Sequence, residues 1–113
     1  MSTTANQCIS ETQGDLVLVR LRGEVDLSWS QQVRRAILDA LGVSPKVCVD
    51  LSEVSYIDSS GIAALVEGFQ SARSKGRKFG LVAASAAVMS VLKLARLDKV
   101  FPLFASVEAV QGS

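Results

Sequence analysis

The stretch that decides the fold of this chain is VCVDLSEVSYIDSSGI, residues 47–62. It opens, after Pro45, with a short run of β-branched and apolar residues, a pattern typical of a strand buried on both faces of a sheet. It then passes through a predicted polar turn and ends in Asp-Ser-Ser-Gly, residues 58–61. A helical pattern follows at once, because apolar residues recur with a period near 3.6 at Ile62, Leu65, Val66, Phe69 and Ala72.

A carboxylate and two hydroxyls therefore stand where the predicted strand passes into the predicted helix, at Asp58, Ser59 and Ser60. Sites in open α/β sheets form outside the carboxyl ends of strands, and a helix N-terminus offers N–H groups to an anion. The same three residues are also typical of an ordinary helix cap, which the residues alone favour. The residues alone leave both interpretations open.

Upstream of this stretch the pattern predicts two strands, over residues 8–12 and 16–22, joined by a turn at 13–15. The second strand alternates apolar and charged residues, so we expect it at an edge or covered on one side only. A polar connection over 23–28 leads into a helix that Ser28 or Ser30 can cap and Gly42 can end. The apolar stripe of this helix is Val33, Ile37, Leu38 and Leu41.

Downstream, the helix after residue 61 is expected to end at Lys75-Gly76. The remaining predicted elements are a strand over 79–83, a helix capped by Ser85 with Val88, Met89, Leu92 and Ala95 inward, a strand over 100–104, and a terminal helical segment over 106–111. Ten residues are expected in the core: Val49, Leu51, Ile57, Ile62, Leu65, Val66, Phe69, Leu81, Val88 and Leu92.

The predicted order of elements is β-β-α-β-α-β-α-β-α, which favours an α/β fold. We expect a central mixed sheet of roughly four or five strands packed against about four helices. Residues 1–7 are expected to be a flexible tail, and residues 8–113 a single domain.

Composition narrows the possible functions. The 113 residues are 49% hydrophobic with a net charge of +1, and no segment approaches the ~18 consecutive apolar residues of a membrane span. Residues 1–7 lack the apolar region of a signal peptide. We therefore expect a cytoplasmic protein without membrane insertion. The near-neutral charge gives no reason to expect direct nucleic-acid binding.

Catalytic groups are also scarce. The chain has no histidine, which excludes Ser-His-Asp and Cys-His catalysis and every His-ligated metal site. It has no phosphate-binding loop of the Walker or Gly-x-Gly-x-x-Gly type. The thiols Cys8 and Cys48 are expected to stay reduced. The sequence thus predicts a protein that is not an enzyme and needs no cofactor or metal.

Residues 49–62 resemble the core motif of STAS domains, the family shared by sulphate transporters and anti-sigma factor antagonists. Residues 23–26, Gly-Glu-Val-Asp, resemble that family's earlier turn, and the break at Lys75-Gly76 and the segment 92–97 also match. The resemblance covers nearly the whole chain from residue 8 and implies a STAS-type fold.

What the resemblance implies about function is a partner-binding switch. In bacterial anti-sigma factor antagonists, a serine kinase that is itself the anti-sigma factor phosphorylates the serine directly after the motif's aspartate. The unmodified antagonist binds this kinase and releases the sigma factor, and the phosphorylated antagonist does not bind. By this match the phosphorylated residue is Ser59, with the carboxylates of Asp26 and Asp58 beside it. A serine phosphatase is a further candidate partner.

The partner interface is expected around this serine, at Ser60, Gly61, Ala64 and Gly68. Ala64 and Gly68 are expected on the outward side of the helix, where small residues let a partner's backbone approach closely. A glycine inside a helix costs roughly 1 kcal/mol relative to alanine, which favours a compensating role. A tolerated exposed glycine is the other interpretation.

Two other functions stay open. The first keeps the fold but makes the chain a STAS subunit of an ABC-type lipid transport system, of the kind that maintains outer-membrane lipid asymmetry, with the transporter's ATPase subunit as partner. The second is an enzyme, which the missing base, metal site and cofactor loop disfavour. Neighbouring genes would distinguish the partner-binding switch from the transporter subunit: a serine kinase gene would favour the switch, and genes for a permease and an ATPase would favour the transporter subunit.

Overall fold

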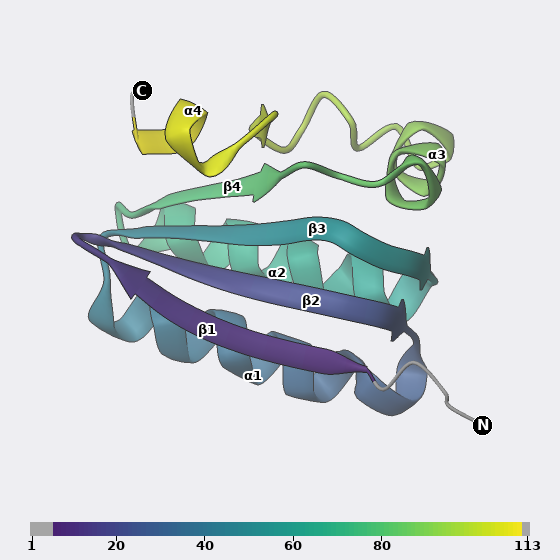
Figure 1. Cartoon of the computed structure of the whole chain (residues 1–113), viewed down its shortest axis with the longest axis horizontal. Helices are drawn as coiled ribbons and strands as arrows, with labels where there is room; N and C mark the ends of the chain where they lie inside the picture. Colours follow the sequence, from purple (N-terminus) through teal and green to yellow (C-terminus); the bar gives the residue numbers. More distant parts are fainter. Residues whose placement is uncertain (1–5, 112–113) are drawn as a thin grey trace.

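The protein is described over residues 6–111 by a computed structural model (Figure 1). The order of strands and helices is the one predicted from the sequence. The elements are β1 (Gln7–Gln13), β2 (Leu16–Val25), α1 (Leu27–Val43), β3 (Lys46–Ile57), α2 (Ser59–Ser74), β4 (Lys78–Val82), α3 (Ala86–Leu94), β5 (Leu103–Phe104) and α4 (Val107–Gln111).

The five strands form one mixed sheet in the order β1-β2-β3-β4-β5, so β3 lies at its centre as predicted. Only β1 is antiparallel to its neighbour, and β2 to β5 run parallel. The two crossovers that flank β3 place α1 and α2 on the same face of the sheet (Figure 1). Both helices therefore begin at the edge where β2 and β3 end.

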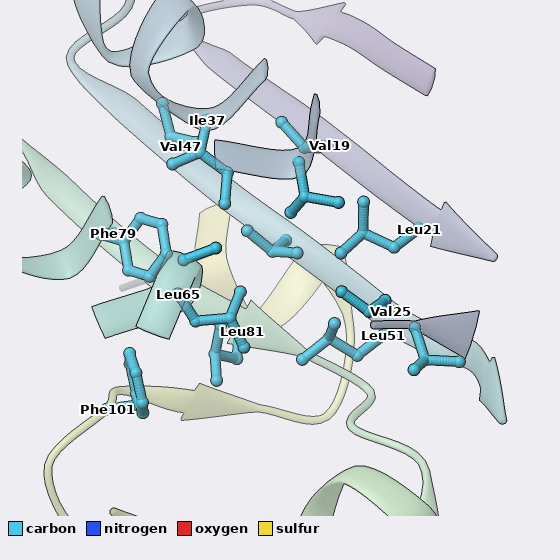
Figure 2. Packing of buried hydrophobic residues seen from close by; sticks show 14 of the residues in the cluster. Val19, Leu21, Val25, Ile37, Val47, Leu51, Leu65, Phe79, Leu81 and Phe101 are labelled. Atoms are coloured by element: carbon cyan, nitrogen blue, oxygen red, sulfur yellow. The ribbon is translucent and has the colours of Figure 1, made fainter. Parts of the chain in front are cut away.

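The main core lies between this face of the sheet and the two helices. Figure 2 shows side chains of β2, β3 and β4 meeting Ile37 of α1 and Leu65 of α2, both fully buried. Eight predicted core residues are confirmed as buried: Val49, Leu51, Ile57, Ile62, Leu65, Leu81, Val88 and Leu92. Val66 and Phe69 are partly buried and pack against the same cluster.

A second, smaller cluster covers part of the opposite face. It contains Leu16, Leu18, Cys48, Val82 and Val110, so α4 folds back over the beginning of β2 and β3. The predicted edge position of β2 is wrong, because β1 and β3 pair with both its sides and residues 16–19 are buried on both faces. One-sided cover holds only from Arg20 onward.

Several element ends differ from prediction. The predicted polar turn is absent, because its residues continue β3. The strand accommodates them with a shift of its register against β2 between Arg20 and Arg22. Helix α1 begins one residue after Asp26, which caps it in place of Ser28 or Ser30. It runs past Gly42 and ends before Ser44, because the residue preceding Pro45 must be extended.

The N- and C-terminal parts of the chain also differ. Of the predicted tail, residues 1–5 lie outside the described residues, Gln7 already belongs to β1, and the Asn6 side chain accepts a hydrogen bond from the Glu24 N–H at 3.0 Å. Ala95 is exposed, because α3 ends at Leu94. The strand predicted over 100–104 is reduced to β5, since only two of its residues pair with β4.

The core assignment of α2 can be tested at Leu65. Leu65→Ala should lower the free energy of unfolding by about 2–5 kcal/mol, since it empties a fully buried position. Leu94→Ala, at a leucine that is 84% exposed, is the control and should change it by less than ~0.5 kcal/mol. Urea denaturation measures both. Equal losses in the two variants would contradict the assignment.

Candidate functional site

The candidate site lies where α1 and α2 begin, at the carboxyl ends of β2 and β3. Val25 and Ile57 are register partners at the ends of these strands. The Asp58 N–H donates to the Val25 carbonyl at 3.2 Å, which continues the pairing of β2 and β3 beyond the last residue of β3. The two helix N-termini are thereby held side by side.

Asp58 caps α2. One oxygen of its carboxylate accepts from the Ser60 N–H at 2.9 Å, the Gly61 N–H at 3.2 Å and the Ser60 hydroxyl at 2.5 Å. The Ser60 hydroxyl is the main reason that the pKa of Asp58 is lowered. Desolvation opposes the shift, and the backbone N–H groups of Gly61, Ser60 and Leu27 add to it. Since Leu27 is the first residue of α1, the carboxylate of Asp58 interacts with the N-termini of both helices.

Asp26 repeats this arrangement at α1. Its carboxylate accepts from the Ser28 N–H at 3.1 Å and from the Ser28 hydroxyl at 2.6 Å. Both helices therefore start with the same Asp-x-Ser cap, and the interpretation of Asp58 and Ser60 as an ordinary cap is correct for these two residues. The middle residue of the pattern differs, being Leu27 in α1 and Ser59 in α2.

Ser59 is the first residue of α2 and is exposed, as predicted. Among residues 6–111 its hydroxyl has no hydrogen-bond partner, whereas the neighbouring Ser60 hydroxyl is held by Asp58. The two serines thus differ in chemistry. The Ser60 hydroxyl belongs to the helix cap, whereas the Ser59 hydroxyl makes no hydrogen bond within residues 6–111.

The prediction that Ala64 and Gly68 lie on the outward side of α2 is wrong. Ala64 is 4% exposed, and Gly68 is buried where α1 packs on α2. A Cβ on Gly68 would lie 2.6 Å from Cγ2 of Ile37. Gly61 is buried too, and a Cβ there would lie 2.8 Å from the Val25 carbonyl oxygen. The backbone and side chains of the same chain pack closely against these small residues. Their small size therefore needs no binding partner as an explanation.

A shallow hollow of about 200 Å³ between the first turns of α1 and α2 was not predicted from the sequence. Arg34 and Glu67 close it with an ion pair at 2.7 Å, which lowers the pKa of Glu67. Leu27, 73% exposed, stands at its other end. Because Arg34 and Glu67 are 33 positions apart, only the packing of the helices could reveal their contact.

Groups suited to catalysis do not gather here. Within the described residues no three His, Cys, Asp or Glu side chains are placed to hold a metal ion. Burial raises the pKa of the Cys48 thiol to about 11, so it is a poor nucleophile at neutral pH. Across residues 6–111, every helix is too short or too polar to cross a lipid bilayer.

Comparison with known proteins agrees with the sequence motifs. A model of the STAS domain matches residues 7–110. The anti-sigma-B factor antagonist of Listeria monocytogenes is 27% identical over 97 residues, which is 84% of either chain. The crystal structure of an anti-sigma factor antagonist from Mycobacterium paratuberculosis has a TM-score of 0.85 and 26% identity, over 96% of this chain and 93% of that one.

A more distant structure shares the fold. It is the Bacillus cell fate determinant SpoIIAA in its phosphorylated form, with a TM-score of 0.72 and 22% identity, over 96% of this chain and 97% of that one. Together these similarities confirm the predicted α/β fold class and the resemblance of the sequence motifs to those of STAS domains.

The Asp58 cap can be tested by its pH dependence. Its carboxyl pKa is lowered by folding, so the stability it adds is present above the usual value of about 3.9 and lost as the pH falls through the lowered value. Asparagine caps a helix as well as aspartate but does not titrate. In Asp58→Asn the free energy of unfolding should therefore fall less steeply as the pH drops below about 4, and Asp58→Ala should cost about 1 kcal/mol at pH 7.

The control for this cap is Asp39→Asn, on the exposed side of α1, where the carboxylate has no hydrogen bond within the described part of the chain. Its unfolding curves should follow the wild type at every pH. If Asp58→Asn also follows the wild type, the carboxylate does not stabilise the start of α2.

Gly68 and Gly42 form a matched pair for testing the contact between the helices. Gly42 lies in α1 with nothing within 4 Å of a built Cβ, so Gly42→Ala should raise the free energy of unfolding by up to about 1 kcal/mol. Gly68→Ala gains the same helix propensity but drives its methyl group into Ile37, and should lower stability. Stabilisation by both substitutions in urea denaturation would contradict the close packing.

Proposed function

Because the chain belongs to the STAS domain family, we propose that it is an anti-sigma factor antagonist controlled at Ser59. In this proposal the protein binds an anti-sigma factor that is also a serine kinase, and phosphorylation of Ser59 ends the binding. It is a regulatory binding protein rather than an enzyme. The observation that carries the proposal is the exposed Ser59 hydroxyl, without a hydrogen bond among the described residues, at a capped helix N-terminus.

Accessibility favours Ser59 over its neighbour as the phosphorylated residue. A kinase must take the hydroxyl into its own active site, and among residues 6–111 the Ser59 hydroxyl has no hydrogen bond to lose on doing so. Phosphorylation of Ser60 would break the 2.5 Å hydrogen bond to Asp58 and with it part of the helix cap. The relatives' names and the phosphorylated form of the Bacillus protein support a phosphorylation-controlled antagonist.

The fold should tolerate the phosphate. A phosphoserine carries about −1.5 to −2 charges at pH 7, and the positive end of a helix dipole favours an anion at the first residue of α2. Asp58, whose pKa is lowered, stays ionised beside it. The phosphorylated site is therefore strongly negative without any need to unfold.

A partner surface packed over Ser59 would not tolerate it. Burying an unpaired charge costs several kcal/mol, and every 1.4 kcal/mol is tenfold in affinity. Electrostatics alone can therefore lower the affinity more than a hundredfold. No conformational change is required for the switch.

The surface offered to the partner differs from the one expected from the sequence. Since Ala64 and Gly68 are occupied by packing, the groups around Ser59 that a partner can reach are Leu27, Ala63 and the Arg34–Glu67 pair. Leu27 presents a large apolar side chain next to the phosphorylation site. We assign it the role of an anchor that the partner buries together with Ser59.

The transporter-subunit function is not favoured, because the named relatives are anti-sigma factor antagonists. The cytoplasmic location and a serine phosphatase that restores binding belong to the proposal. A gene for a serine kinase beside this one would support it.

The test is phosphate transfer and binding in three variants. Ser59→Ala should remain folded, bind the kinase and take no phosphate, as intact-protein mass spectrometry would show. Ser59→Asp should fold but bind less well, although one carboxylate carries less charge than a phosphate. Ser55→Ala, at an exposed serine of β3, is the control and should behave as the wild type in both assays.

Two results would redirect the proposal. Phosphate mapped by fragmentation to Ser60 would move the site by one residue. Lack of phosphate transfer by any co-encoded kinase, together with full binding by Ser59→Asp, would rule out the switch and favour the transporter-subunit function.

A further inference from the structure

A cavity of about 240 Å³ opens at the end of the sheet opposite to Ser59, where β3 and β4 begin. Since β3 has 12 residues, its two ends lie roughly 35 Å apart. The cavity and the proposed switch are therefore separate. Its walls come from α2, β3, β4, α4 and the segments beside them: Lys46, Val47, Cys48, Phe69, Arg77, Lys78, Phe79, Gly80, Pro102, Phe104 and Val110.

The mouth of the cavity is cationic. Lys46 and Lys78 are register partners at the first positions of β3 and β4, so their side chains start from neighbouring backbones, and Arg77 directly precedes Lys78. Like charges directly opposite each other in a sheet are destabilising. In the part of the chain that the structure describes, Arg77 and Lys78 form no ion pair, and Lys46 has only Asp15 at 3.9 Å.

The interior is apolar and aromatic. Phe69 and Phe79 lie 6.3 Å apart between ring centroids, with their planes tilted by 53°, and the ring of Phe104 lies over Gly80, where a Cβ would come within 2.7 Å of it. Cys48, 1% exposed, brings a neutral thiol to the wall. Among residues 6–111, no carboxylate lines the cavity. An apolar chamber behind three cations is suited to an amphiphile with a negative head.

We propose that this cavity binds a single-chain fatty acid, with its carboxylate at Lys46, Arg77 and Lys78 and its hydrocarbon chain against the aromatic rings. A cavity of this size suits a hydrocarbon chain of medium length, for which octanoate is the probe. Bound carboxylate relieves the repulsion between the two lysines, and the buried chain supplies the apolar contacts.

Neutralisation of a helix end does not account for these cations. The helix α2 already has Arg73 in its last turn, and its guanidinium lies 5.8 Å from the Phe69 ring centroid. Arg77 and Lys78 come after the helix has ended and the chain has turned at Gly76. Among residues 6–111, the two further cations beside Lys46 have no carboxylate in the cavity, which favours a bound anion as their partner.

The test titrates the full ¹⁵N-labelled chain with octanoate and follows backbone amide shifts. Saturable shifts should concentrate at Cys48, Phe79 and Gly80, while those of Ser59 stay constant. Octanol, which lacks the charge, and acetate, which lacks the chain, should each bind at least about tenfold more weakly. The double variant Arg77→Gln/Lys78→Gln should lose about tenfold for octanoate. Its control is Lys93→Gln/Lys99→Gln, at exposed lysines outside the cavity, which should lose nothing.

Absence of saturable binding, equal binding of octanol, or unchanged affinity in the Arg77→Gln/Lys78→Gln variant would overturn the proposal. Co-sedimentation of the wild type with phosphatidylglycerol vesicles, without saturable shifts at Cys48 in the octanoate titration, would do so too, by assigning the cations to a membrane surface.

Discussion

The central position of β3 is the constraint on which the rest of the structure depends. Parallel strands pair with both its sides, so the chain must cross over once before it and once after it. Both crossovers carry their helices over the same face. As a result α1 and α2 start next to each other, and two helix N-termini meet at one edge of the sheet. This concentration of positive dipole ends explains why two aspartate caps stand there.

Each aspartate at this edge caps its own helix. Asp26 and Asp58 each accept from an N–H group and the serine hydroxyl of their own helix start, and within residues 6–111 the side chain of the middle residue of each Asp-x-Ser pattern takes no part in the cap. In α1 that residue is an exposed leucine, and in α2 it is an exposed serine. An exposed apolar side chain and an exposed hydroxyl thus stand at the starts of two helices that pack against each other. Such a pair suits a surface whose binding must be strong in one state and absent in another.

Much of this was predictable from the sequence, because it depends on residues close together in the chain. The burial of β3 follows from its unbroken apolar run, and the start of α2 follows from an aspartate three residues before the glycine that opens its apolar stripe. The exposure of Ser59 follows from its place at the first turn of a helix. Errors at this level include the two ends of α1, which Asp26 caps in place of Ser28 or Ser30 and which runs past Gly42.

What only the tertiary structure decided is how distant segments meet. Helical periodicity identifies the side of α2 with large apolar residues, but Ala64 and Gly68 carry too little surface for hydropathy to assign them. Their burial depends on how closely α1 approaches, and so on Ile37, far away in the sequence. The register of β3 and β4 likewise brings Lys46 and Lys78 together across 32 positions, and α4 returns to bury Leu16 and Leu18. A sequence pattern reveals local periodicity and helix caps. The close approach of two helices and the clustering of charged side chains depend on how elements distant in the sequence pack together.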